Sequence, residues 1–263
     1  MSWGEAVVEA VDTPDLERRF GGLARLYGAP AYERLRRLRL AVVGVGGVGS
    51  WAVEALARCG VAELVLIDLD QVAESNINRQ VQALGATLGQ AKVQALRERI
   101  ADIHPGCLVH EVEDFVTPDN WPGLLPIAVD GVIDACDQVR AKAAVAAWAR
   151  RAGVALVCCG AAGGKRQPHR LEVADLAEVS HDPLLASLRS RLRREHQAPR
   201  QGRMGVACVF SREPVAPPAG AATCDTDGTL NCHGYGSSVV VTAAVGLAAA
   251  AELIEQVLRR SSD

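Results

Sequence analysis

One stretch, residues 39–80, limits the possible folds of this chain more than any other. An apolar run at 40–43 predicts a short buried strand, and a helical stretch begins at about residue 50. A second apolar run ends at Asp68, 19 residues after the last glycine of the turn between them. That turn has the pattern G-x-G-G-x-G, formed by Gly44, Gly46, Gly47 and Gly49. Strand, glycine turn, helix, strand and acid in this order predict a Rossmann-type nucleotide site.

Each part of this unit has a physical reason. Glycines permit a tight turn and a close approach of the backbone to phosphates, and the first turn of a helix offers free N–H groups to an anion. The acid, Asp68, can accept hydrogen bonds from ribose hydroxyls. The alternative is a glycine-rich turn that binds nothing.

The rest of the chain alternates between strand and helix patterns as far as residue 160, which predicts an α/β fold with a mainly parallel sheet and helices on both faces. Further strands are expected at 64–67, 108–112, 127–133, 155–159 and 206–210. Helices are expected within 1–38 and at 50–58, 89–103, 141–151, 184–196 and 237–258. Residues 212–233 are rich in Pro, Gly, Ala and Thr and are expected to form a mobile loop.

Composition excludes some classes of protein. The net charge is −3, so the molecule as a whole is not an electrostatic nucleic-acid binder, although local patches remain possible. The N-terminus is polar, so no signal peptide is expected, and most of the eight cysteines lie in apolar surroundings; we therefore expect a cytoplasmic location. No C-x-x-C pair is present, so no structural zinc is expected. Cys208 is either a reactive thiol or a buried structural residue, and spacing assigns no role to Cys224 and Cys232.

Two features of the C-terminal part leave alternatives open. The helix expected at 184–196 and the residues after it carry six arginines, which form either a phosphate-contacting surface or a solvated face: Arg189, Arg191, Arg193, Arg194, Arg200 and Arg203. The small-apolar run Val239–Ala251 is short for a membrane span, which needs about 20 residues. We expect a buried helix in the core or at a dimer interface, with peripheral membrane association as the alternative.

Polar residues follow the carboxyl ends of several expected strands, where open parallel sheets bind ligands. They are Asp68, Asp70, Asn76, Asn78, Arg79, Lys92 and Asp137. A dehydrogenase has no use for an arginine, a lysine and a second acid converging on the phosphates. An enzyme that displaces pyrophosphate from ATP does, because cationic side chains and a carboxylate-held Mg²⁺ stabilise the developing charge. We expect Arg79 and Lys92 to be the catalytic cations and Asp137 to hold the metal.

These motifs resemble the E1-like (ubiquitin-activating, MoeB/ThiF) superfamily. The resemblance rests on the G-x-G-G-x-G-S turn, the run I-D-x-D-x-V-x-x-S-N-x-N-R-Q, the G-x-x-K helix start and the D-A-C-D strand end. It implies adenylation of a carboxylate. By motif position Asp68 would bind the ribose, Asn78 and Arg79 the triphosphate, Lys92 the phosphates and Asp137 the Mg²⁺. Asp70 and Asn76 belong to the same run and are counted with the nucleotide-binding residues.

Features outside this common core resemble the tRNA threonylcarbamoyladenosine dehydratase branch of the superfamily. They are R-F-G-G-L-A-R-L-Y-G at 19–28, G-A-A-G-G at 160–164, H-D-P-L at 181–184 and G-V-A-C-V-F-S at 205–211. The resemblance then spans residues 1–263 as one adenylating domain, with a nucleotide-binding core at 19–160. Residues 165–263 would be an extension for tRNA contact and dimerisation.

That branch implies ATP-dependent cyclisation of N6-threonylcarbamoyladenosine in tRNA, through an acyl-adenylate that the substrate's own carbamoyl oxygen attacks. It also implies a homodimer, tRNA and not DNA as the nucleic-acid partner, and a link to a cysteine desulfurase with its sulfur-acceptor protein. In the superfamily an arginine of the neighbouring subunit often reaches the ATP, and Arg19 and Arg25 are both candidates.

Two other functions stay open. The first is MoeB/ThiF-like adenylation of the C-terminal glycine of a ubiquitin-like sulfur carrier. The second is a non-catalytic, nucleotide-binding scaffold of a sulfur relay.

Overall fold

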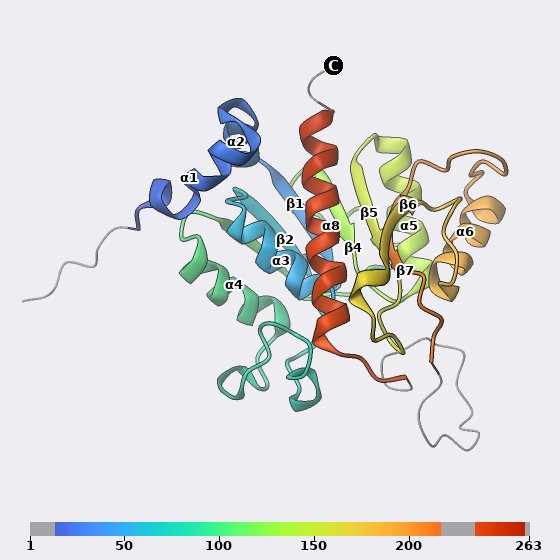
Figure 1. The fold of residues 1–263 in the computed structure, drawn as a ribbon, viewed down its shortest axis with the longest axis horizontal. Coiled ribbons are helices and arrows are strands. Elements are labelled where there is room, and N and C mark those ends of the chain that lie inside the picture. The colour runs from blue at the N-terminus through green and yellow to red at the C-terminus, as the bar shows by residue number, and fades with distance from the viewer. Residues whose placement is uncertain (1–13, 217–234, 261–263) are drawn as a thin grey trace, which may run out of the picture.

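The computed structural model describes residues 14–216 and 235–260, and these form one seven-stranded sheet covered by helices (Figure 1). The strand order is β3-β2-β1-β4-β5-β7-β6. All neighbouring strands run parallel except β6, which pairs antiparallel with β7 at the edge. The chain order reverses between β1 and β4, which is the topological switch point where such sheets bind ligands.

The elements follow the predicted alternation. The strands are β1 (Arg39–Val43), β2 (Glu63–Ile67), β3 (Leu108–Val112), β4 (Gly131–Asp134), β5 (Ala155–Cys159), β6 (Leu171–Asp175) and β7 (Ala207–Ser211). The helices are α1 (Leu16–Tyr27), α2 (Ala29–Leu35), α3 (Gly49–Arg58), α4 (Lys92–Ile103), α5 (Val139–Ala152), α6 (Pro183–Glu195) and α8 (Val239–Arg259). Short 3₁₀ turns occur at Glu74–Asn76, Gly85–Thr87 and Pro168–Arg170.

The alternation of strand side chains divides the apolar core into two layers. Leu40 and Val42 of β1 point to the layer formed with α3, α4 and α8, whereas Ala41 and Val43 point to the layer formed with α5 and α6. All four side chains are at most 2% exposed. The fold is therefore α/β with helices on both faces of a mainly parallel sheet, as predicted.

Helix α8 explains the apolar C-terminal run. It is long and apolar enough to cross a membrane by length and composition alone, but it packs along α3, β4 and β5 in the middle of one sheet face (Figure 1). Its buried side includes Val241, Val245, Ala249 and Leu253, spaced four residues apart, so that they lie on one face of the helix. The run expected at Val239–Ala251 is thus a core helix of this sheet.

Close packing of α8 on α3 depends on Gly246. A Cβ atom there would lie 2.4 Å from the carbonyl oxygen of Val48 and 2.9 Å from the amide nitrogen of Ala52. Gly246→Ala is therefore expected to push the two helices apart and to lower the free energy of unfolding by about 1–3 kcal/mol, as overpacking does. Urea denaturation measures this.

The matched control is Gly85→Ala, because a Cβ at Gly85 meets nothing within 4 Å. It should change the free energy of unfolding by less than about 0.5 kcal/mol. Equal stability of the Gly246 and Gly85 variants would contradict the packing described.

Two features of the fold differ from the expectations, and one expected segment lies mostly outside the described residues. The strand expected at 127–133 begins only at Gly131, because the Asp130 carboxylate accepts a hydrogen bond from the Arg39 amide at 2.9 Å and residues before it form a loop. Strand β6 was not expected, since an edge strand with Glu172 and Asp175 has no continuous apolar run. The loop expected at 212–233 lies mostly outside the described residues, as do Cys224 and Cys232.

Candidate active site

A cavity of about 390 Å³ opens at the carboxyl ends of the central strands, beside the switch point between β1 and β4. Nine of the predicted nucleotide-site residues line it: Gly44, Gly46, Gly47, Asp68, Asp70, Asn76, Arg79, Lys92 and Asp137. These residues come from five separate strand ends and helix starts. The fold therefore brings together residues that are up to 93 positions apart in the sequence.

The glycine turn packs too tightly for any side chain at two of its positions. Gly44 has φ +79°, and a Cβ there would lie 3.0 Å from the amide nitrogen of Cys136. A Cβ at Gly49 would lie only 1.8 Å from the Gly44 carbonyl oxygen. Gly49 does not line the cavity, so its role is to let α3 begin directly against the turn. Gly46 and Gly47 then present bare backbone to the cavity, which suits phosphate oxygens.

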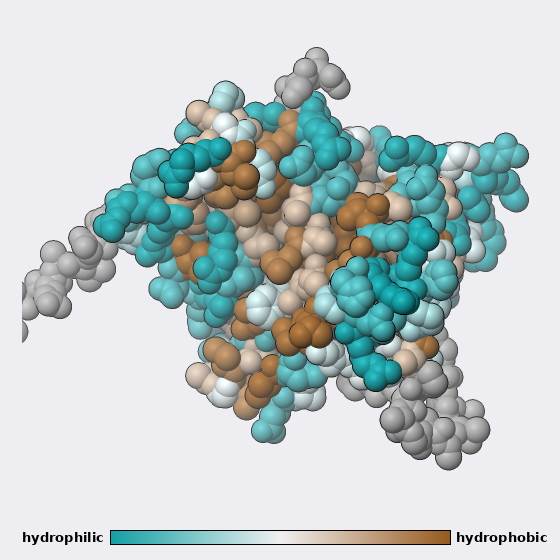
Figure 2. Space-filling model, in the orientation of Figure 1, coloured by the Kyte–Doolittle hydropathy of each residue, from teal (hydrophilic) through white to brown (hydrophobic). Residues whose placement is uncertain are grey.

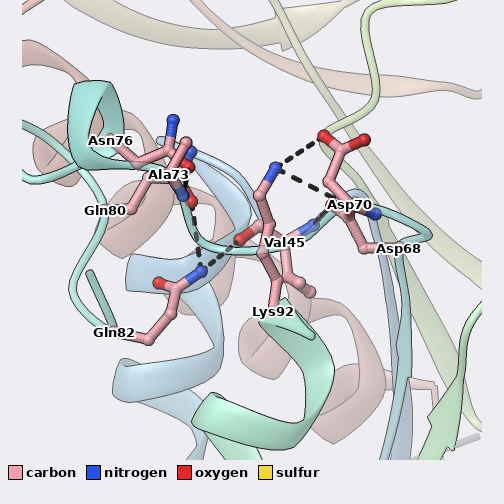
Figure 3. Close-up of polar contacts among 8 residues, drawn as sticks. All are labelled: Val45, Asp68, Asp70, Ala73, Asn76, Gln80, Gln82 and Lys92. Atoms are coloured by element: carbon pink, nitrogen blue, oxygen red, sulfur yellow. Dashed lines mark hydrogen bonds and ion pairs between the residues drawn. The ribbon is translucent and has the colours of Figure 1, made fainter. Parts of the chain in front are cut away.

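Lys92 lies close to the carboxylates of Asp68 and Asp70, just beyond the carboxyl end of β2 (Figure 3). Its Nζ is 2.6 Å from an oxygen of Asp70 and 3.8 Å from an oxygen of Asp68. The lysine side chain is 6% exposed and that of Asp70 is 57% exposed, and both residues line the cavity. An anionic ligand there would compete with Asp70 for a cation that is already in place.

Asp68 is held in a fixed orientation by backbone donors. One of its oxygens accepts from the amide of Val45 at 2.8 Å and the other from the amide of Asp70 at 3.0 Å (Figure 3). Burial raises the pKa of Asp68, while Lys92 and these two hydrogen bonds act in the opposite direction without cancelling the effect. Asp68 therefore takes up a proton at a higher pH than an ordinary aspartate.

Arg79 lines the cavity, whereas Asn78 does not line it and instead holds the Arg79 side chain. The Arg79 guanidinium donates to the carbonyl of Ser75 at 2.7 Å and to the side-chain oxygen of Asn78 at 2.9 Å. Asn78 in turn donates to the carbonyl of Ser237 at 2.9 Å, just before α8. Asn78 does not line the cavity, so the structure gives it a bridging position between Arg79 and the start of α8.

Asp137 is an exposed carboxylate in the cavity wall, at the end of the turn that follows β4. A fully buried pair stands behind it, in which Lys142 Nζ lies 3.0 Å from an oxygen of Asp134. Burial alone would lower the pKa of Lys142, but Asp134 outweighs it and raises that pKa, so the lysine stays charged. The same Asp134 accepts from the amide of Cys136 at 3.2 Å, which fixes the turn that carries Asp137.

Several cavity residues were not predicted. Phe115 and Asp114 follow β3, so the strand-end rule that found Asp68 could have found them. Thr242 and Leu184 reach the cavity from α8 and α6 through packing, and no local pattern indicates this. Gln80 ends the predicted polar run but was not singled out.

The remaining predicted residues lie outside the cavity. Arg19 donates to the carbonyls of Asp102 and Ile103 at 2.6 and 2.8 Å, so it caps the end of α4. Arg25 is exposed, and no hydrogen bond or ion pair of its side chain is found within 14–216 and 235–260.

The expected arginine helix is α6, but its arginines differ in their surroundings. Arg189 donates to the carbonyls of Leu176 and Val179, which makes it part of the structure. Arg193 donates to the carbonyl of Pro199, and Arg191 and Arg194 pair with Glu195. Beyond the helix, Arg200 and Arg203 are exposed.

Cys208 is buried in β7, and burial raises its pKa well above the usual value for a thiol. Of its two interpretations, the structure favours the structural one. Over the described ranges, no group of three or more His, Cys, Asp or Glu side chains is arranged to hold a metal ion.

Comparison with known proteins gives a consistent result. The model of the ThiF family matches residues 19–263. The chain is 40% identical to the tRNA threonylcarbamoyladenosine dehydratase of Haemophilus influenzae over 98% of this chain and 100% of that protein. It is 42% identical to the Escherichia coli protein of the same name, over 93% of this chain and 95% of that protein.

Solved structures agree with the sequence comparison. The crystal structure of the Escherichia coli dehydratase in complex with ATP matches with a TM-score of 0.86 at 40% identity, over 96% of this chain and 99% of that one. By contrast, the molybdopterin-synthase adenylyltransferase of Salmonella typhimurium is 36% identical over 48% of this chain and 50% of that protein.

Proposed function

The chain belongs to the ThiF family, and from this premise we propose that it is an ATP-dependent tRNA threonylcarbamoyladenosine dehydratase. The observation that carries the proposal is the match to dehydratases over nearly the full length of both chains, together with a cavity that gathers the expected ATP-site residues. The molybdopterin-synthase adenylyltransferase of Salmonella typhimurium matches only about half of the chain, at 48%.

The proposed reaction has two steps. First, a carboxylate oxygen of the threonylcarbamoyl group attacks the α-phosphorus of ATP, and the bond to pyrophosphate breaks. Second, the carbamoyl oxygen of the same group attacks the activated carboxyl carbon, AMP leaves, and the carbamoyl nitrogen loses its proton. The net result is a ring and the loss of one water, with ATP converted to AMP and pyrophosphate. The substrate supplies both nucleophiles, so the protein needs none.

The cavity residues position and neutralise the triphosphate. Lys92 and Arg79 place two cations at the strand ends, where they stabilise charge on the phosphates as pyrophosphate departs. The bare backbone of Gly46 and Gly47 lets phosphate oxygens approach closely. Asp68, already oriented by backbone amides, accepts hydrogen bonds from the ribose hydroxyls.

The residues present fit a magnesium ion carried by ATP. Mg²⁺ usually keeps several waters and binds one or two carboxylates plus substrate phosphates, and Asp137 is an exposed cavity carboxylate with no cation beside it among the described residues. When bound, the ion would supply charge neutralisation at the phosphates. Asp137 would hold it, and the buried Asp134–Lys142 pair keeps that carboxylate in place.

Nucleoside binding should depend on pH through Asp68. Its raised pKa means that protonation begins at a higher pH than for an ordinary aspartate, and a protonated carboxyl loses an acceptor for the ribose. We therefore expect the affinity for adenosine to fall as the pH is lowered through the raised pKa of Asp68. Calorimetric titration with adenosine measures this without interference from titrating phosphates.

Two controls accompany the titration. The ligand 2′,3′-dideoxyadenosine lacks both hydroxyls and should bind weakly and almost independently of pH. Asp68→Asn should bind adenosine weakly at every pH. An affinity of wild type for adenosine that stays constant as the pH is lowered through the titration of Asp68 would show that Asp68 does not contact the ribose.

The proposed tRNA contact uses the outer arginines of α6 and the residues after it. Because Arg189 and Arg193 donate to backbone carbonyls, the contact is assigned chiefly to Arg191, Arg194, Arg200 and Arg203. These side chains are at least partly exposed and lie beyond the first turn of α6, whose Leu184 lines the cavity. An RNA strand along α6 would thus lead to the active site.

We also propose a homodimer of single-domain subunits, as the family resemblance implies. The outward side of α8 leaves Val240 and Leu247 about half exposed, at 52% and 48%, and Figure 2 shows apolar residues gathered across the middle of this face. Of the two candidate arginines for a neighbouring site, Arg25 is favoured, because Arg19 caps α4. A cytoplasmic location and a sulfur-relay partner are proposed from composition and resemblance alone.

One experiment separates the candidate functions. Pyrophosphate release from ATP is measured with tRNA carrying N6-threonylcarbamoyladenosine, with the same tRNA lacking the modification, and with a ubiquitin-like protein ending in Gly-Gly. The proposal expects release with the modified tRNA only. Release with the Gly-Gly protein would favour the carrier-activating alternative, and ATP binding with no release in any mixture would favour the scaffold.

A further inference from the structure

The chain has three lysines, and each is buried in an ion pair with an aspartate. Lys92 lines the cavity, and Lys142 supports the turn that carries Asp137. The third pair, Lys165 with Asp182, has no part in the mechanism above. Both side chains are 0% exposed, with Nζ 3.5 Å from the carboxylate oxygen. A buried ion pair contributes little to the stability of a fold, so this pair is a candidate for a role in the active site.

The two oxygens of Asp182 serve two different elements. Oδ1 accepts from the amide of Leu185 at 3.0 Å and so caps the first turn of α6. Oδ2 accepts from the amide of Ala161 at 2.9 Å. Ala161 belongs to the segment Gly160–Gly163, all four residues of which line the ATP cavity. One carboxylate therefore joins the start of α6 to a wall of the active site.

The fit between this wall and α6 is close. A Cβ at Gly160 would lie 2.3 Å from Oδ2 of Asp182, so only glycine lets the wall approach the carboxylate. Leu184, in the first turn of α6, is 4% exposed and lines the same cavity. Lys165 completes the junction by donating to the carbonyl of Ser211 at the end of β7, at 3.2 Å.

The turn that leads into α6 is held in a conformation that it would not adopt freely. His181, directly before Asp182, has φ +59°, which is rare for a residue other than glycine. Such backbone conformations persist where several surrounding contacts hold them in place. The contacts of Asp182 provide that constraint, so the entry to α6 has one fixed position relative to the cavity.

We propose that Asp182 is a positioning residue that fixes the Gly160–Gly163 wall of the ATP cavity relative to α6, so that tRNA contact along α6 and adenylation in the cavity are coupled through this carboxylate. Lys165 provides the counter-charge that lets the carboxylate stay buried between the two elements. The inference rests on the proposed function, because it needs RNA on α6 and ATP in the cavity. It gives a role to the G-A-A-G-G and H-D-P-L motifs, which the adenylation chemistry does not use.

The test is a double variant of the full chain, Lys165→Met with Asp182→Asn. Methionine keeps the length of the lysine without its charge, and asparagine can accept through one oxygen only, so no unpaired charge remains buried. Three quantities are measured: the Kd for ATP, the Kd for tRNA carrying N6-threonylcarbamoyladenosine, and kcat for pyrophosphate release when both are saturating. Thermal unfolding confirms that the variant is folded.

We expect both Kd values within about twofold of wild type and a kcat lower by about 10- to 100-fold, the range that a small misplacement of reacting groups produces. The matched control is Asp15→Asn, because Asp15 caps α1 through the same kind of bond, to the amide of Arg18 at 3.0 Å, and does not line the cavity. It should keep the wild-type kcat.

Two results would overturn the proposal while leaving the dehydratase function intact. One is a folded double variant with wild-type kcat. The other is a variant whose Kd values weaken while kcat at saturation is unchanged, which is the pattern of a merely structural pair. If modified tRNA does not stimulate the wild-type chain at all, the proposed function fails first and the coupling fails with it.

Discussion

Lys92→Ala is expected to reduce kcat for pyrophosphate release by about 100- to 1,000-fold, the loss typical of removing one preorganised electrostatic group. The ammonium is buried, lies 2.6 Å from Asp70, and faces the cavity where phosphates would lie. An ammonium already in position needs no reorganisation as charge builds on the departing pyrophosphate. Stopped-flow measurement of pyrophosphate release, with modified tRNA and ATP saturating, gives this value.

The matched control for Lys92 is Asp70→Asn. Asp70 is the residue that holds the ammonium in the absence of a nucleotide, and its side chain is 57% exposed. Removing its charge takes away a competitor of the phosphates, so kcat should fall by much less than in Lys92→Ala. A folded Lys92→Ala variant with wild-type kcat would show that Lys92 only neutralises the two aspartates.

Asp137→Asn is expected to cause a loss of similar size, about 100- to 1,000-fold in kcat. The reason is different, because Asp137 is proposed to hold the magnesium ion carried by ATP. The magnesium concentration needed for half-maximal rate should rise in the variant, whereas the Kd for adenosine, which carries no phosphate, should stay the same. Initial rates over a magnesium titration, together with calorimetry with adenosine, measure both.

Asp114→Asn is the control for Asp137, because Asp114 is a second carboxylate that lines the cavity and accepts from the amide of Phe115 at 2.7 Å. It should leave the magnesium dependence unchanged. Identical magnesium dependence of wild type and Asp137→Asn would remove Asp137 from the metal-holding role.

The residues of the site that could be predicted are those fixed by local chain geometry. Gly44 and Asp68 directly follow β1 and β2, Asp137 lies in the short turn after β4, and the carboxyl ends of parallel strands meet at one edge of the sheet. Lys92 is the first residue of α4, the helix that follows the polar run after β2, so its position in the sequence also placed it at this edge of the sheet. For the same reason the central strands could be predicted from their apolar runs.

The residues that could not be predicted depend on contacts between distant segments. Asn78 turns away from the cavity because it bonds to Ser237, 159 positions later. The guanidinium groups of Arg19 and Arg189 donate hydrogen bonds to backbone carbonyls of distant segments. The number and spacing of arginines in the sequence do not indicate such bonds. Thr242 reaches the cavity from α8, which packs closely on α3 at Gly246. Strand β6 lacks an apolar run because it is an edge strand.

The central claim is that this chain closes a ring on a modified adenosine in tRNA at the expense of ATP. The most direct measurement is mass analysis of the nucleosides from tRNA carrying N6-threonylcarbamoyladenosine after incubation with the protein and ATP. The account predicts a product lighter than the substrate by one water, formed in equal amount with AMP, and absent in Arg79→Ala. An unchanged nucleoside, in a sample where ATP is nevertheless converted to AMP, would contradict it.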